Sequence, residues 1–99
     1  MRYDFEWDMR KATQNLQKHK VAFARATGVF RDPNAISLLD EEHSITEERW
    51  VTIGVDQTGI ALVVIHTFMP LGADSCRIRI ISARRATNNE ISQLTGTTS

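Results

Sequence analysis

The chain has 99 residues, of which 41% are apolar, and a formal net charge of zero. This length predicts one small domain over residues 1–94, followed by a disordered tail over residues 95–99. No apolar run reaches the roughly twenty residues of a membrane span, the acidic N-terminus is unlike a secretion signal, and the single cysteine, Cys76, excludes an internal disulfide. We therefore expect a cytoplasmic protein with no membrane contact.

Charge is distributed unevenly along the chain. Residues 1–31 contain seven Lys and Arg against three Asp and Glu, residues 32–48 contain six acids and no Lys or Arg, and residues 76–99 contain four arginines and one glutamate. Because local fields govern the binding of a charged partner, two basic segments are compatible with RNA binding despite the zero net charge. Ordinary solvated faces would give the same pattern, so both explanations stay open.

The N-terminal third predicts a strand and two helices. Residues 2–7 alternate aromatic and charged side chains, as a half-buried strand does. Asp8 can cap a helix over residues 9–18. Apolar residues then recur at helical spacing over residues 21–30, which predicts a second, amphipathic helix that ends before Pro33.

The rest of the chain reads mostly as strands. Residues 35–39 form a short apolar strand, and residues 50–55 and 60–67 are the clearest strands, separated by a short hairpin loop. The next strand covers residues 77–86, where Ile81 interrupts the alternation. Apolar residues on both of its faces predict a central strand, covered on both sides.

Short connections predict that the last three strands form an antiparallel meander. Thr87 and Glu90 are spaced as a capping box, which predicts a short C-terminal helix. The expected fold class is therefore α+β, with an antiparallel sheet that contains a central three-strand meander, two N-terminal helices and a short C-terminal helix.

The pattern of chemically active residues argues against a metal site. The three histidines and Cys76 show none of the short paired spacings that metal ligands adopt. A glycine-rich phosphate loop is absent as well. We therefore expect neither a metal ion nor another cofactor.

Residues suited to metal-free RNA cleavage lie instead at predicted strand and helix ends. Such cleavage needs a base for the 2′-hydroxyl proton, an acid for the leaving 5′-oxygen, and cations that stabilise the charge on phosphorus. Histidine has the ordinary pKa that suits both proton transfers, and arginine offers donors that match a phosphate. We expect the candidates to converge on one pocket: His19, Glu48, Arg49, Arg84 and Arg85 as catalytic residues, and Lys11, Lys18, Arg77 and Arg79 as RNA-binding residues.

Each candidate also has a purely structural explanation. The helix dipole alone favours a basic pair such as Lys18 and His19 at a helix end. Glu48 and Arg49 are neighbours that could form a surface ion pair worth about 0.5 kcal/mol. Arginines that alternate along a strand are often only solvated. Spacing alone leaves these explanations open.

The same residues resemble the BrnT toxin family. The matching motifs occur in the same order, from about Phe5 to Glu90, and include Phe5-Glu6-Trp7-Asp8, Lys18-His19-Lys20-Val21, Glu47-Glu48-Arg49-Trp50 and Arg77-Ile78-Arg79-Ile80-Ile81-Ser82-Ala83-Arg84-Arg85. The resemblance implies a RelE-like fold and a ribonuclease toxin of a type II toxin–antitoxin system, which cuts RNA and inhibits translation. It also implies a hetero-oligomer with BrnA, a ribbon-helix-helix antitoxin that binds operator DNA.

Three positions depart from the family pattern. Lys20 stands where the family usually has glycine, Phe68 where an acid is often found, and Leu94 where an aromatic residue is usual. These departures motivate an alternative function, in which the chain is a catalytically weakened homologue that binds the antitoxin and regulates the operon. A plain RNA-binding domain without an antitoxin is a third possibility.

Overall fold

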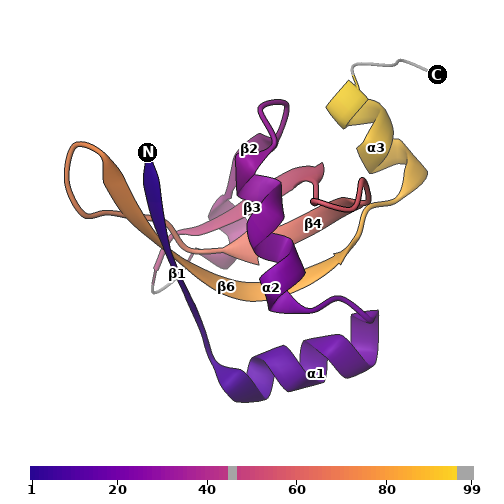
Figure 1. Ribbon diagram of the computed structural model, residues 1–99, viewed down its shortest axis with the longest axis horizontal. Helices are drawn as coiled ribbons and strands as arrows, with labels where there is room; N and C mark the ends of the chain where they lie inside the picture. Colours follow the sequence, from indigo (N-terminus) through magenta and orange to yellow (C-terminus); the bar gives the residue numbers. More distant parts are fainter. Residues whose placement is uncertain (45–46, 96–99) are drawn as a thin grey trace.

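A computed structural model describes residues 1–44 and 47–95, and Figure 1 shows their arrangement as one sheet with helices around it. The helices are α1 (Met9–His19), α2 (Phe23–Ala26) and α3 (Asn88–Thr95), with 3₁₀ turns η1 (Thr27–Arg31) and η2 (Glu41–His43). The strands are β1 (Arg2–Trp7), β2 (Ile36–Asp40), β3 (Arg49–Val55), β4 (Ala61–His66), β5 (Met69–Pro70) and β6 (Ser75–Arg85).

The sheet has the strand order β1-β6-β4-β3-β2, with β5 paired to β6. The predicted meander is confirmed, because β3, β4 and β6 are antiparallel neighbours. The predicted antiparallel sheet is wrong in one respect: β1 pairs with β6 in the parallel sense, so the sheet is mixed. Short loops indicate which consecutive strands pair, whereas this pairing joins the two ends of the chain.

Ile81 interrupts the alternation of β6 because it forms a β-bulge. His66 pairs with Ile80, but its neighbour Ile65 pairs with Ser82, so Ile81 has no partner on β4. An extra residue of this kind shifts the side-chain alternation by one position. The strand is central, as expected, but the interruption marks a bulge and is no sign of a strand covered on both sides.

Helix α1 begins and ends with defined caps. The N–H of Lys11 donates to the Asp8 carboxylate at 3.0 Å, which confirms the predicted N-cap. Lys20 follows the helix with φ of 61°, in the left-handed region, and its N–H donates to the carbonyl of Leu16. The chain therefore keeps a helix end suited to glycine, at a cost of about 1 kcal/mol for the lysine.

The predicted second helix is shorter than expected. Only α2 is α-helical, and the chain continues as the 3₁₀ turn η1. Gly28 lies in η1 against the β3–β4 hairpin, where an added Cβ would lie 3.2 Å from Gln57. We attribute the tighter turn to this close approach. The apolar residues at helical spacing are nevertheless buried, because Phe23, Ala26 and Val29 all lie in the core.

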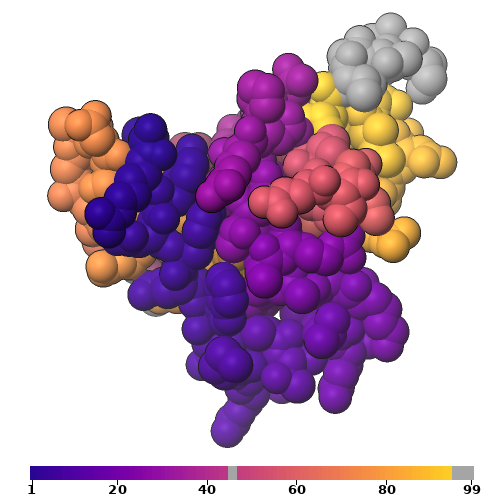
Figure 2. Space-filling model, in the orientation of Figure 1, coloured from indigo at the N-terminus to yellow at the C-terminus, as the bar shows by residue number. Residues whose placement is uncertain are grey.

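The main core lies between the α2–η1 segment and one face of the sheet, which we call the core face. Leu62 and Val64 of β4 and Ile78 and Ile80 of β6 point into it and are almost fully buried. In Figure 2 the α2–η1 segment hides most of the central strands from this side. Figure 1 shows that α1 lies along the margin of the sheet, where β1 has ended.

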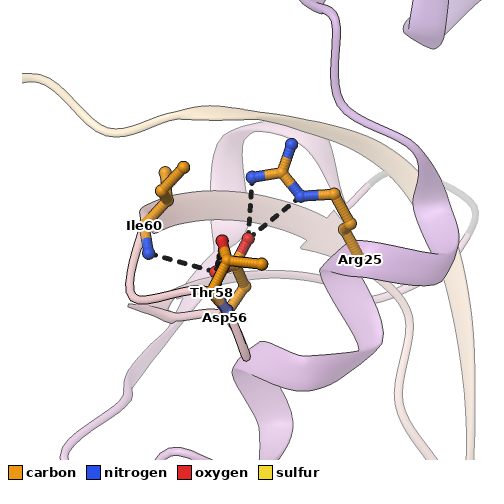
Figure 3. Close-up of polar contacts among 4 residues, drawn as sticks. All are labelled: Arg25, Asp56, Thr58 and Ile60. Carbon is orange, nitrogen blue, oxygen red and sulfur yellow. Dashed lines mark hydrogen bonds and ion pairs between the residues drawn. The ribbon is translucent and has the colours of Figure 1, made fainter.

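An ion pair fastens α2 to the β3–β4 hairpin (Figure 3). Arg25 donates to the Asp56 carboxylate from Nε at 3.1 Å and from a terminal nitrogen at 2.8 Å. The same carboxylate accepts hydrogen bonds from Thr58 and from the N–H of Ile60. Burial would raise the pKa of Asp56, but these hydrogen bonds outweigh burial and hold the pKa far below its ordinary value.

The C-terminal helix begins as predicted. The side chains and backbone amides of Thr87 and Glu90 exchange hydrogen bonds of 2.8 and 3.3 Å, which form the capping box. Thr95 is the last residue of α3, so the disordered tail predicted from residue 95 starts too early. Residues 96–99, the rest of that prediction, lie outside the described part of the chain. No helix in the described ranges is long and apolar enough to cross a membrane.

Candidate active site

Most of the candidate residues border the face of the sheet opposite the core face, which we call the second face. Alternate residues of β6 point into the core, so Arg77 and Arg79 point to the second face. After the bulge, Ser82 is on this face too. It pairs with Ile65 of β4, and Ile65 and Thr67, two positions apart, both point to the second face. The N–H of Thr67 donates to the carbonyl of Arg79, which fixes the register at this level.

A pocket on the second face brings Glu48 close to two arginines. It is lined by Glu6, Glu47, Glu48, Thr67, Phe68, Met69, Arg77 and Arg79. Arg79 forms an ion pair with Glu47, and Glu6 lies opposite Arg79 in the β1–β6 register. We call this site the Glu48 pocket. It combines three carboxylates, which can accept a proton, with two guanidinium groups, which can bind a phosphate.

Lys18 and His19 lie in a second site, a groove between α1 and β6. It is lined by Lys11, Gln14, Asn15, Lys18, His19, Ile81 and Ser82. We call it the His19 groove. His19 is partly buried, whereas Lys11 and Lys18 are exposed. Their position at i and i+7 places both lysines on the side of α1 that lines this groove.

Asn15 holds α1 against β6. The residue is 6% exposed, and its side chain exchanges two hydrogen bonds with the backbone of Ala83, at 2.8 and 3.1 Å. Its amide also donates to the carbonyl of Val21 at 2.9 Å. Beyond the end of β1, the Asn15 side chain therefore makes the backbone hydrogen bonds to β6 that a neighbouring strand would make. These bonds also fix the helix that carries Lys18 and His19.

The Glu48 pocket and the His19 groove are adjacent along β6. Arg79 lines the first and Ser82 lines the second, and three residues of a strand span about 10 Å. The two sites share no lining residue, so the single pocket expected from the sequence is divided into two neighbouring sites, which we call together the charged band. A phosphate bound between Arg79 and Ser82 would have a carboxylate on one side and an imidazole on the other.

Arg84 lies on the second face beyond Ser82, but its guanidinium is already engaged. It donates to both carboxylate oxygens of Glu90 in α3, at 2.8 and 2.9 Å. This bidentate pair raises the pKa of Arg84 and lowers the pKa of Glu90. The Thr87 hydrogen bonds lower the Glu90 pKa further and burial opposes the change, so that the pKa is about 2. Arg84 therefore anchors α3 to the end of β6.

The expected convergence of Arg84 and Arg85 on one site is wrong. The strand continues through both residues, which pair with Val63 and Leu62, so their side chains point to opposite faces. Arg85 lies on the core face and is exposed.

The expected convergence of Arg49 with Arg84 and Arg85 is also wrong. Arg49 is one residue beyond the Trp50–His66 pair, level with Thr67, whereas Arg84 pairs with Val63. Four residues of strand separate these levels by about 13 Å.

Arg49 lies nearer to the Glu48 pocket. β3 and β6 both pair antiparallel with β4, which lies between them, so they run in the same direction. Arg49 and Arg79 are both level with Thr67, the residue after β4, and their backbones are two strand spacings apart, about 10 Å. Arg49 is therefore closer to the Glu48 pocket than to Arg84.

The other two histidines lie outside the charged band. His66 is 3% exposed, its ring nitrogens contact the Thr52 hydroxyl at 2.6 Å and the Thr67 carbonyl at 2.9 Å, and burial lowers its pKa. His43 lies in η2, and its Nδ1 is 2.9 Å from a carboxylate oxygen of Asp40. Within residues 1–44 and 47–95, no group of three or more His, Cys, Asp and Glu is arranged to hold a metal ion.

Three residues of the site were missed by sequence reasoning. Glu6 and Glu47 line the Glu48 pocket, and Asn15 fixes α1. Glu6 could not be assigned without the register between β1 and β6, and Glu47 could not be assigned without its ion pair to Arg79. Asn15 carried a usable signal, because it is an amide between Lys11 and Lys18 on one side of a helix.

Comparison with known proteins gives a family match and a structural match. A family model described as ribonuclease toxin, BrnT, of type II toxin–antitoxin system matches residues 7–90. The 1.1 Å crystal structure of the ribonuclease toxin BrnT of Brucella abortus superposes with a TM-score of 0.60 at 23% sequence identity, over 89% of this chain and 100% of that chain. At this identity the superposition shows a shared α+β fold. No curated protein matches the chain.

Proposed function

Because the chain belongs to the BrnT family of ribonuclease toxins of type II toxin–antitoxin systems, we propose that it is an endoribonuclease that needs no metal ion. The observation that supports the proposal is the charged band, in which Glu48 with Arg77 and Arg79, and Lys18 with His19, line two neighbouring pockets beside β6. The expected active site is therefore on the second face of the sheet.

In the proposed reaction, RNA lies along β6 with the scissile phosphate near Ser82. Glu48 or His19 takes the proton of the 2′-hydroxyl, and the 2′-oxygen attacks phosphorus. The bond to the 5′-oxygen breaks, and that oxygen takes a proton from His19 or Lys18. The products are a 2′,3′-cyclic phosphate and a 5′-hydroxyl end.

Arginines stabilise the charge that develops on phosphorus in this proposal. Arg77 and Arg79 line the same pocket as Glu48, and Arg49, the next residue in the chain after Glu48, can reach this pocket from β3. Two of the five N–H groups of Arg84 contact Glu90 and one contacts the carbonyl of Arg85, so two remain that can contact RNA while Arg84 anchors α3. Arg85 lies on the other face, so we leave it out of the reaction.

The remaining parts of the proposal concern the cellular role. RNA cleavage in the cytoplasm would inhibit translation, and an antitoxin of the ribbon-helix-helix class, like BrnA, would neutralise the toxin in a hetero-oligomer that binds operator DNA. The family match implies an antitoxin partner and supports this assignment. The RelE-like relationship stays a prediction.

Purified protein should cleave a single-stranded RNA in the presence of EDTA. A matched RNA with a single 2′-deoxy nucleotide at the mapped cleavage site should resist cleavage there, because the attacking oxygen is missing. Cleavage of both RNAs at the same rate would contradict the proposed chemistry. Intact RNA together with tight antitoxin binding would favour the alternative of a weakened toxin that acts as a regulatory module.

A further inference from the structure

Strand β2 is an edge of the sheet that carries little protection against a further strand. Its inner side pairs with β3, and within the described residues no other strand pairs with its outer side. Residues 36–39 contain no charge and no proline, the two devices that usually protect an edge. The opposite edge, β1, carries a charged residue at every second position.

Apolar side chains are exposed on both sides of this edge. Leu38 is 59% exposed on the second face, and Leu39 is 37% exposed on the core face. An exposed edge strand with apolar side chains is prone to pair with a strand of another chain.

An apolar pocket opens beside β2 on the core face. Its volume is about 240 Å³, and it is lined by Tyr3, Phe30, Ser37, Trp50, His66, Phe68 and Ile78. Ser37 belongs to β2, so the pocket extends to the edge itself. An added strand would direct alternate side chains to the core face, where one could enter this pocket.

The surroundings of β2 are acidic. Asp40 ends the strand, Glu41 and Glu42 follow in η2, and Asp32 precedes it. Residues 32–44 contain no Lys or Arg. A second copy paired antiparallel through β2 would bring the acids of η2 close to Asp32 of the other copy, which like-charge repulsion disfavours. A basic partner would be attracted to the same edge.

We propose that a partner protein adds a strand to the outer side of β2. The added segment is extended, carries an apolar side chain for the pocket beside Ser37, and carries Lys or Arg opposite Asp40, Glu41 and Glu42. Backbone hydrogen bonds of the β2 edge supply affinity, while the pocket and the acids select the partner. The inference rests on the proposed function in one respect, because it identifies this partner as the antitoxin.

The test uses the purified protein encoded beside the toxin gene and measures its Kd for the full chain by calorimetry. Replacing Leu38 and Leu39 together by lysine, L38K/L39K, should weaken binding about 30-fold or more, because it places charges on the edge. The control is Met9→Lys, which changes an apolar residue of α1 that is 73% exposed and should leave the Kd unchanged. E41K/E42K should weaken binding about 10-fold, whereas Asp74→Lys in the exposed loop before β6 should not.

Hydrogen exchange locates the partner independently of the variants. Formation of the complex should slow exchange in residues 36–40. Unchanged Kd values for the β2 variants, protection confined to α1, or no complex with the wild-type chain would each overturn the proposal. RNA cleavage by L38K/L39K alone should equal that of the wild type, since β2 is outside the charged band. Failure of the wild type to cleave RNA would refute the proposed function and leave the binding result to decide this inference.

Discussion

Replacing His19 with alanine is expected to lower the rate of RNA cleavage by the purified protein about 100-fold or more. The imidazole lines the groove between α1 and β6 and is partly buried, next to Ile81 and Ser82. Its removal takes away a proton donor or acceptor, while the Asn15 hydrogen bonds that hold α1 remain. The measurement is the single-turnover cleavage rate of an end-labelled RNA at saturating protein.

The matched control is His43→Ala. This histidine is exposed in η2 and pairs with Asp40, so its loss should change the cleavage rate less than twofold. A second comparison separates Glu48, in the pocket with Arg77 and Arg79, from Glu42 in η2, although both glutamates are exposed. Glu48→Gln should slow cleavage and Glu42→Gln should not. Equal rates for the His19 and His43 variants would contradict the assignment of the His19 groove to catalysis.

Replacing Asp56 with alanine is expected to lower the free energy of unfolding by about 3 kcal/mol at pH 7. The Asp56 side chain is 1% exposed, and the variant would leave Arg25 without its carboxylate and the amides of Thr58 and Ile60 without their acceptor. Urea unfolding followed by tryptophan fluorescence measures the change. Asp74→Ala, in an exposed loop, should change the free energy by less than about 0.5 kcal/mol.

The same variant should show a defined pH dependence. The pKa of Asp56 is lower in the folded than in the unfolded chain, so its carboxylate stabilises the fold above the unfolded pKa. This contribution is lost as the pH falls from about 5 toward the folded pKa. The difference between the wild type and Asp56→Ala should therefore shrink between pH 5 and pH 2.5. Glu90 titrates at low pH in both proteins, so its contribution cancels. A difference that stays constant or grows would contradict the assigned ion pair.

Local sequence signals predicted the elements well where the cause was local. The Asp8 cap, the Thr87–Glu90 capping box and the β3–β4–β6 meander each depend on residues close in the chain, and each is observed. The parallel β1–β6 pair joins residues more than seventy positions apart, and short-range patterns carry no information about such a pairing. The break at Ile81 was visible in the sequence, but a bulge and a strand buried on both sides give the same pattern.

The candidate site was predictable in its residue types more than in its geometry. His19, Lys18 and Lys11 line one groove, and Glu48 shares a pocket with Arg77 and Arg79. The separation of Arg49 from Arg84 depends on the strand register. The orientation of Arg85 depends on how far β6 continues, which the arginine pair itself does not reveal.

The central claim is that RNA binds along the charged band, and amide chemical shifts of the protein test it most directly. A 2′-O-methyl RNA oligonucleotide, which lacks the attacking hydroxyl, can be titrated into isotope-labelled protein without cleavage. We predict shift changes concentrated in residues 77–84 of β6, residues 11–19 of α1 and Glu48. Changes confined to β2 and the apolar pocket on the core face would show that RNA binds elsewhere and would contradict the account.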